Sequence, residues 1–148
     1  MQVTPESQTI LAFDFGQRRI GVACGQTFTG TANPLTTVQH LANQPDWQAI
    51  RQLLAEWQPQ QLVVGLPIRH DGSDSPITKA ARAFAHELQQ RSELPVSLHN
   101  ETLSSNAASE VLREQRQSGQ RKKRLQKEDI DQIAATLILQ SWLEENKK

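Results

Sequence analysis

The stretch that decides the fold reads ILAFDFGQRRIGVACG and occupies residues 10–25. Together with Thr9 it begins with TILAFDF, a run that is apolar on both faces, as in the central strands of a sheet. The letters GQRR are typical of a turn, and IGVACG is a second strand-like run. We therefore expect strands at 9–15 and 20–25 that pair as a hairpin.

Asp14 is the unusual residue of this stretch, because strand interiors are depleted in aspartate. A carboxylate buried there loses its hydration, which costs several kcal/mol unless something compensates. Hydrogen bonds, a basic partner or a bound cation could each supply that compensation. The stretch alone leaves all three open.

The rest of the chain adds strands and helices in alternation. We expect a weaker third strand at 28–38, interrupted by Pro34, a buried strand at 61–67 and a further short strand at 95–101. Helices are expected at 46–58, at 75–91, from Ser104 or Ser105 to just before Gly119, and from about Asp129 to Glu145, with Asp46 and Ser75 as caps of the first two. This order predicts an α/β fold whose mixed sheet has a three-strand antiparallel start, then parallel strands, with helices on its faces.

Length and composition limit the class of protein. The 148 residues fit one compact domain over residues 1–148, with flexible tails at 1–8 and 146–148. The single cysteine, Cys24, excludes an internal disulfide framework and fits a reducing compartment. No signal-peptide pattern opens the chain, and no apolar run approaches the ~20 residues of a membrane span. We expect a cytoplasmic protein without membrane contact.

The net charge gives no indication of a polyanionic partner, because 16 basic and 16 acidic residues cancel. The charges are not evenly spread, however. Between Arg113 and Lys127 lie seven of the 16 basic residues and one acid, Glu114. Such a run is usually a solvated connection, but it can also hold nucleic-acid phosphates.

Three carboxylates stand where strands end or on an apolar helix: Asp14, Glu101 and Asp131. Each alone has an ordinary explanation, since acids cap turns and stabilise the first turn of a helix. On the last helix, Asp131 is expected at the edge of a buried stripe formed by Ile130, Ile133, Ala134, Leu137 and Ile138. Three inward-facing carboxylates that converge would repel one another unless a cation joins them, and Mg²⁺ or Mn²⁺ accepts such oxygen ligands.

Four motifs in this order resemble the YqgF family, also called RuvX-like, of Holliday-junction-resolvase-like proteins with an RNase H-like fold. They read FDFGQRRIGVA, VVGLPIRHDGS, NETLSS and DIDQIAATLILQSWL, and they extend from about Ile10 to Leu143. The resemblance implies a nuclease in which Asp14, Glu101 and Asp131 are catalytic and hold Mg²⁺ or Mn²⁺. It also implies processing of the 5′ end of pre-16S rRNA in ribosome biogenesis, with Holliday junction resolution as the alternative.

Two positions depart from the family pattern. Asn100 stands where the family usually has Asp before the catalytic Glu, and Thr102 stands where it usually has Arg after it. Asn100 can still ligate or hydrogen-bond through its carbonyl, whereas Thr102 cannot replace a guanidinium that clamps phosphate. Arg18, Arg19 and Arg69 are candidates to compensate.

Other basic residues complete the expected substrate-binding set. Lys79 and Arg82 follow the polar loop GLPIRHDGSDSP, which comes directly after a buried strand, and the basic run supplies Arg121, Lys122, Lys123 and Arg124. His70 and His99 lie in or beside these segments but show no metal-ligand spacing. Trp47, Trp57 and Trp142 recur on apolar helix faces, so we expect them in the core rather than stacked on bases.

Three functions are compatible with these features. The first is a metal-dependent nuclease acting on pre-rRNA or branched DNA, within a pre-ribosomal particle and as a monomer or weak homodimer. The second is an ATP-handling protein of the actin and sugar-kinase type, which would need two such domains. The third is a catalytically inactive nucleic-acid-binding factor, to which Asn100 and Thr102 lend some weight.

Overall fold

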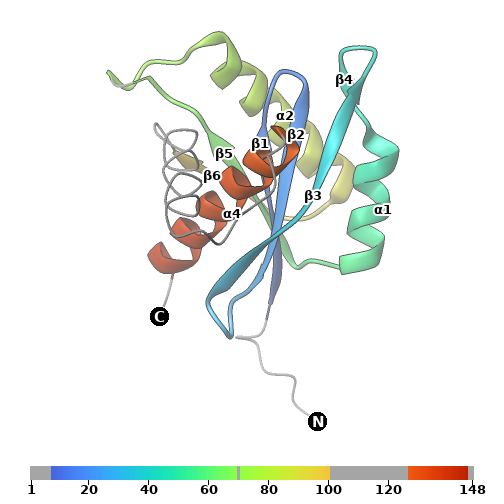
Figure 1. The fold of residues 1–148 in the computed structure, drawn as a ribbon, viewed down its shortest axis with the longest axis vertical. Helices are drawn as coiled ribbons and strands as arrows, with labels where there is room; N and C mark the ends of the chain where they lie inside the picture. The colour runs from blue at the N-terminus through green and yellow to red at the C-terminus, as the bar shows by residue number, and fades with distance from the viewer. Residues whose placement is uncertain (1–7, 70, 101–126, 147–148) are drawn as a thin grey trace, which may run out of the picture.

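The computed structural model describes residues 8–69, 71–100 and 127–146. These residues form a six-stranded sheet with helices on both faces (Figure 1). The strands are β1 (Thr9–Phe15), β2 (Arg19–Gln26), β3 (Thr31–Leu41), β4 (Gln44–Pro45), β5 (Gln61–Leu66) and β6 (Val96–Asn100). The helices are α1 (Trp47–Trp57), α2 (Pro76–Ser92) and α4 (Lys127–Glu145).

The strand order is β4-β3-β2-β1-β5-β6. The pairs β1–β2 and β2–β3 are antiparallel, while β1–β5 and β5–β6 are parallel. The predicted mixed sheet with an antiparallel start and parallel continuation is therefore confirmed. Because β1 has a neighbour on each side and helices on both faces, its apolar residues are needed on both of its faces.

Two apolar clusters hold the layers together. On one face, Phe13, Ile20 and Val64 of the sheet pack against Ile50 of α1 and Leu88 of α2, with Trp47 and Trp57 at the periphery. On the other face, Ile10, Ala12 and Ala23 pack against α4, including Trp142. The expectation that the three tryptophans serve the core is confirmed.

The face of α4 that packs on the sheet differs from the predicted stripe. The buried residues are Ala134, Ala135, Ile138, Leu139, Trp142 and Leu143, whereas Ile130, Ile133 and Leu137 are half-buried. Helical spacing from Asp131 through Ala135 and Ile138 to Trp142 places Asp131 in line with the buried face rather than at its edge. The helix is apolar on nearly every side, so periodicity did not determine which side meets the sheet.

Glycines in the sheet set this contact. A Cβ on Gly25 would lie 3.0 Å from Leu139 Cδ2 and 2.7 Å from the Thr31 carbonyl oxygen, and a Cβ on Gly65 would overlap the side chain of Ile138. A Cβ on Gly21 would overlap the main-chain carbonyl oxygen of Asp131. Glycine at these three positions lets α4 lie directly on the backbone of β2 and β5.

The third strand begins and ends later than predicted, and β4 was not predicted at all. Val22 pairs with Thr36 and Ala23 pairs with Pro34, so Leu35 is an extra residue in β3. Such a bulge is where a sheet accepts proline, which explains why Pro34 does not end the strand. β3 then turns at Ala42 and Asn43, both with positive φ, into the two-residue β4.

The predicted caps are confirmed, and two other predictions fall outside the described residues. The Asp46 side chain accepts a hydrogen bond from the Ala49 N–H, and Ser75 forms a capping box with Thr78. The helix expected between Ser104 and Gly119 lies outside the described residues, as do residues 1–7 of the expected amino-terminal tail. The single domain over residues 1–148 stays a prediction. No helix within the described ranges is long and apolar enough to cross a membrane.

Candidate active site

Asp14 lies near the carboxyl end of β1, between two glycines of the neighbouring strands. Its Cα pairs with Gly21 of β2 on one side and with Gly65 of β5 on the other. Alternation along β1 puts Asp14 on the same face as Ile10 and Ala12, which pack against α4. Asp14 is half-buried, and its carboxylate is therefore on the face of the sheet that α4 covers.

Asp131 of α4 lies over the same point of the sheet. Its backbone is packed on Gly21, the register partner of Asp14. A Cβ on Gly21 would lie 3.0 Å from the Asp131 Cβ. Because the Cβ atoms of a directly opposed strand pair lie about 4.5–5.5 Å apart, the Cβ atoms of Asp14 and Asp131 lie within about 8.5 Å of each other.

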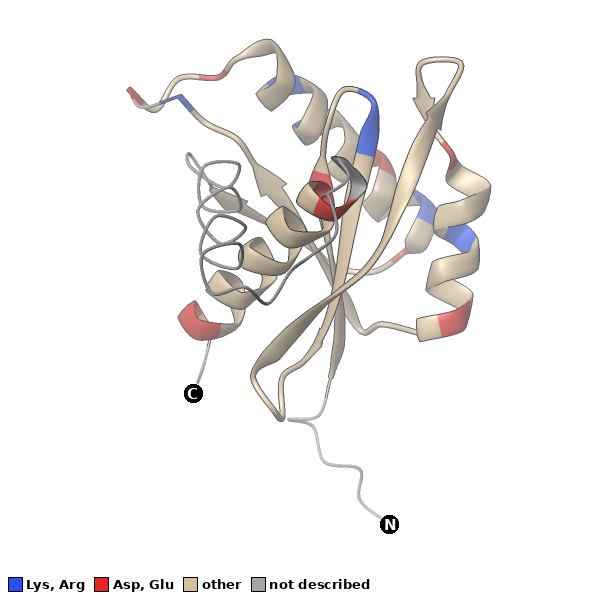
Figure 2. Ribbon diagram, viewed as in Figure 1, with Lys and Arg blue, Asp and Glu red and all other residues tan. Residues whose placement is uncertain are grey.

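Arg19 is the basic partner of Asp131. The Arg19 Nε donates a hydrogen bond of 2.8 Å to Asp131 Oδ2, joining residues 112 positions apart in the chain. Both side chains are largely shielded from solvent, with 21% of Arg19 and 24% of Asp131 exposed. Figure 2 shows the acidic start of α4 beside the basic turn between β1 and β2. Arg19 was predicted as a substrate-binding residue, and in the structure its Nε is engaged by a predicted metal ligand.

The turn between β1 and β2 is held by backbone and ring contacts. The Gly16 N–H donates to the Arg19 carbonyl oxygen at 2.9 Å, and a His40 ring nitrogen lies 2.8 Å from the Gly16 carbonyl oxygen. The His40 ring also meets the Phe15 ring edge-on at 5.3 Å between centroids. Sequence reasoning missed His40, and its position far along the chain from Gly16 gave no signal of this contact.

The loop after β5 is folded rather than simply polar. Ile68 and Asp74 form an isolated antiparallel bridge, and Gly72, with a positive φ, closes the turn between them. Asp71 accepts hydrogen bonds from the Ser73 hydroxyl at 2.6 Å and the Ser73 N–H at 2.9 Å. Those bonds lower the pKa of the Asp71 carboxyl below its ordinary value. The loop therefore has a defined shape.

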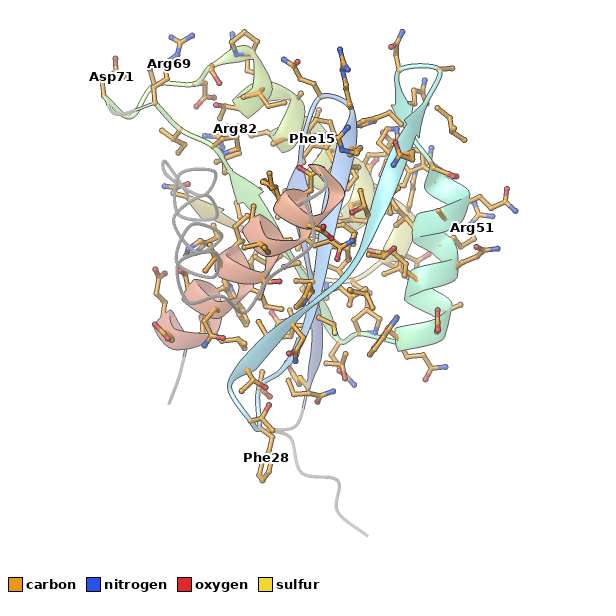
Figure 3. The ribbon with its side chains drawn as sticks, viewed as in Figure 1. Phe15, Phe28, Arg51, Arg69, Asp71 and Arg82 are labelled. Atoms are coloured by element: carbon orange, nitrogen blue, oxygen red, sulfur yellow. The ribbon has the colours of Figure 1, made fainter. Side chains whose placement is uncertain are left out.

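The basic side chains predicted to bind substrate differ in their surroundings. Arg82 pairs with Asp74 at 3.1 Å. The side chains of Arg18, Arg69 and Lys79 are exposed and make no hydrogen bond or ion pair with any other described residue. Figure 3 shows Arg69 and Asp71 at the far end of the loop, with Arg82 nearer the body of the protein. The basic residues Arg121, Lys122, Lys123 and Arg124 lie outside the described residues.

The third predicted carboxylate, Glu101, also lies outside the described residues, together with Thr102 and His70. The residue before it, Asn100, ends β6 and pairs with Leu66 of β5. Two strand spacings separate β6 from β1, so Asn100 lies about 10 Å across the sheet from β1, at the edge where β1 ends. His99 is buried, and its Nδ1 lies 3.8 Å from Glu145 Oε1 of α4. Within the described ranges, no three His, Cys, Asp or Glu side chains form a metal-binding group.

Gly21 and Gly65 are two further residues of this site that sequence reasoning did not single out. Their signal was present as small residues in two apolar strands, RIGVACGQ and QLVVGL. What the sequence did not show is that both strands flank Asp14, since β5 follows β2 only after two more strands, β3 and β4, and the helix α1. The two glycines leave room over Asp14 that α4 then fills.

Comparison with known proteins gives consistent results. A family model described as "RuvX: Holliday junction resolvase" matches residues 8–145. A protein of Pectobacterium carotovorum named "Putative pre-16S rRNA nuclease" is 47% identical over 139 residues, which cover 94% of this chain and 97% of that protein. A protein of the same name from Haemophilus ducreyi is 48% identical, covering 93% of this chain and 97% of its own length.

Solved structures share the fold at much lower identity. A fowlpox virus resolvase in complex with Holliday junction DNA matches with a TM-score of 0.57 at 16% identity, covering 95% of this chain and 99% of the other. RuvC of T. thermophilus in complex with a Holliday junction substrate matches with a TM-score of 0.56 at 12% identity, covering 95% and 97%. At these identities the likeness is one of fold.

Proposed function

This chain belongs to the RuvX family, and from that membership we propose that it is a metal-dependent nuclease that hydrolyses phosphodiester bonds in structured nucleic acid. The resemblance seen in the sequence is confirmed by the family match over residues 8–145. The prediction of a hydrolase of the nuclease class is likewise confirmed at the level of the family. The residues, the cations and the substrate are the parts proposed here.

One observation carries the proposal. Asp14 and Asp131, from opposite ends of the chain, lie on the same face of the sheet with their Cβ atoms within about 8.5 Å. That separation lets both carboxylates reach a pair of cations ~3.5–4 Å apart. Carboxylate oxygens are the ligands that Mg²⁺ and Mn²⁺ accept, so the donor set fits these ions. Glu101, which follows the last residue of β6 in the sequence, is proposed as the third ligand.

The catalytic roles follow from the chemistry of phosphodiester hydrolysis. Divalent cations in such sites supply a more acidic water and charge stabilisation for the attacking and leaving oxygens. Asp14, between two glycines, is proposed as the central ligand, and Asp131 and Glu101 as the flanking ones. The exposed guanidinium groups of Arg18 and Arg69 are proposed to bind backbone phosphates on either side of the scissile bond, with Lys79 and the run Arg121, Lys122, Lys123 and Arg124 extending that surface.

The proposed substrate is the 5′ end of pre-16S rRNA. Relatives that carry this name share 47–48% identity over nearly the whole chain, whereas the junction-bound structures share 12–16%. The proposed setting is a pre-ribosomal particle in the cytoplasm, with the protein acting as a monomer or weak homodimer. Branched DNA remains the comparison substrate, because the family description names junction resolution.

The test is cleavage of precursor rRNA, single-stranded RNA and a four-way DNA junction, each with Mg²⁺ or Mn²⁺. Asp14→Asn removes one ligand charge without changing side-chain size, and we expect it to abolish cleavage. The matched control is Glu56→Gln, the same carboxylate-to-amide change at an exposed position of α1 on the opposite face of the sheet. Cleavage of precursor rRNA by Asp14→Asn at the wild-type rate would rule out the proposed site.

A further inference from the structure

Arg19 is bonded to one proposed metal ligand, Asp131, and 21% of its side chain is exposed to solvent. Arg19 begins β2, two residues before Gly21, and strand alternation places both on the face that α4 covers. Its side chain therefore runs over the sheet toward Asp131, which is packed on Gly21. Its Nε donates the hydrogen bond to Asp131 Oδ2 there.

We propose that Arg19 links Asp131 to the substrate: its Nε–H holds one oxygen of the Asp131 carboxylate, and its terminal N–H groups donate to a phosphate of the bound nucleic acid. This inference rests on the proposed nuclease function. It assigns Arg19 two contacts, one that positions a metal ligand and one that binds substrate.

The hydrogen-bonding capacity of both groups supports two simultaneous contacts. A guanidinium has five N–H donors in a planar fork, and Nε supplies only one of them. Within the described residues, the Nε bond is the only hydrogen bond that the Arg19 side chain makes. On the other side, Asp131 Oδ2 receives the bond while Oδ1 keeps its lone pairs for a cation.

The surroundings make the ion pair significant. With 21% and 24% of the two side chains exposed, the pair is shielded from the screening that weakens ion pairs at the surface. Asp131 also lies near Asp14, and two close carboxylates repel each other. Arg19 offsets that repulsion and fixes the orientation of the Asp131 carboxylate, as partners of metal-binding carboxylates commonly do.

Lysine cannot reproduce this arrangement. Its ammonium is a single point of charge at the end of a flexible stem, and it lacks the fixed fork that serves two partners at once. Arg19→Lys therefore keeps the positive charge but removes the planar fork of donors that can bind Asp131 and a phosphate at the same time. Arg19→Gln removes both, and Arg51→Gln, at an exposed position of α1 on the opposite face, serves as the matched control (Figure 3).

The experiment measures Mn²⁺ affinity by calorimetry without substrate, binding of precursor rRNA in EDTA, and the kcat and KM of cleavage. Changes around metal ligands typically cost about 10–100-fold in metal affinity or activity. For Arg19→Lys we expect Mn²⁺ affinity and kcat to fall by about that factor, rRNA affinity to fall several-fold, and the circular dichroism spectrum to stay unchanged. Arg51→Gln should match wild type in every measurement.

The outcomes are separable. If Arg19→Lys and Arg19→Gln bind Mn²⁺ and rRNA as wild type does, the proposed link is wrong while the nuclease function stands. If rRNA affinity falls but Mn²⁺ affinity does not, Arg19 does not position Asp131 and the link is also overturned. If the wild-type protein neither binds Mn²⁺ nor cleaves any substrate, the proposed function fails and the link fails with it. An unfolded Arg19→Gln leaves Arg19→Lys as the deciding variant, because the lysine retains the charge that faces Asp131.

Discussion

Gly21→Ala is the substitution for which the structure predicts the most specific consequence. A methyl group at this position would overlap the main-chain carbonyl oxygen of Asp131 and lie 3.0 Å from its Cβ. Ordinary contacts of a Cβ begin at 3.4 Å, and a helix backbone cannot rotate out of the way as a side chain does. The helix must therefore move away from β2, and Asp131 moves with it.

The size of the effect follows from this displacement. Extra atoms in a packed interior typically cost about 1–3 kcal/mol, and replacing glycine returns about 0.4–1 kcal/mol by restricting the unfolded chain. We expect a net loss of about 1–2 kcal/mol in the free energy of unfolding, measured by urea denaturation. A shift of about 1 Å in a catalytic group can cost about 10²-fold in rate, so cleavage should fall by about that factor.

Gly65→Ala is the matched control for this prediction. Gly65 is the other register partner of Asp14, but the atoms that its Cβ would meet belong to the side chain of Ile138. The nearest of those atoms, Cδ1, is the end of a side chain and can shift without moving the helix backbone, so we expect a smaller loss of stability and little change in cleavage. Wild-type stability in Gly21→Ala would refute the packing argument. A destabilised Gly21→Ala that still cleaves at the wild-type rate would refute the link between helix position and the site.

Three further predictions test the metal, the phosphate contacts and the loop. Mn²⁺ at 100 times its dissociation constant should raise the free energy of unfolding of wild type by about 2.7 kcal/mol, measured by thermal melting against EDTA; an equal rise in Asp14→Asn would contradict the site. Arg69→Gln should lower the slope of log affinity against log salt by about 0.7–0.9 in filter binding, and an unchanged slope would exclude a phosphate contact. Ser73→Ala should raise the pKa of Asp71 toward 3.8 in an NMR titration, because the Ser73 hydroxyl makes the hydrogen bond that lowers this pKa most and the mutation removes it. The pKa of Asp71 in the folded wild type lies below 3.8, so its carboxylate stays ionised and bonded to Ser73 as the pH falls to 3.8. These hydrogen bonds are lost only below that pH, when the carboxylate is protonated.

Local chemistry made much of the fold predictable from the sequence. β1 was placed at its observed bounds because a central strand needs apolar residues on both faces, and Asp46 and Ser75 were identified as caps from residue type and spacing. Asp14 was identified because an aspartate is unusual within an apolar strand, where burial of its carboxylate is costly. Each of these signals is contained within a few neighbouring residues.

The features that escaped prediction depend on contacts between distant segments. The sequence does not show that β5 lies beside β1, because this depends on the order of strands in the sheet. The two glycines that flank Asp14 could therefore not be recognised as a pair. The side of α4 that packs on the sheet is determined by those glycines, which leave space for it. The helix sequence does not determine this side, because apolar residues lie on nearly every side of the helix. The roles of Asp14, Glu101 and Asp131 stay predictions.

The ion pair between Arg19 and Asp131 spans 112 positions of the sequence. During synthesis, β1 and β2 leave the ribosome long before α4 exists, so an incomplete chain carries Asp14 without the helix that faces it. Contacts of such long sequence separation form late, because the intervening chain must be ordered first. A chain on which α4 has not yet docked therefore lacks both this ion pair and the second carboxylate on that face of the sheet.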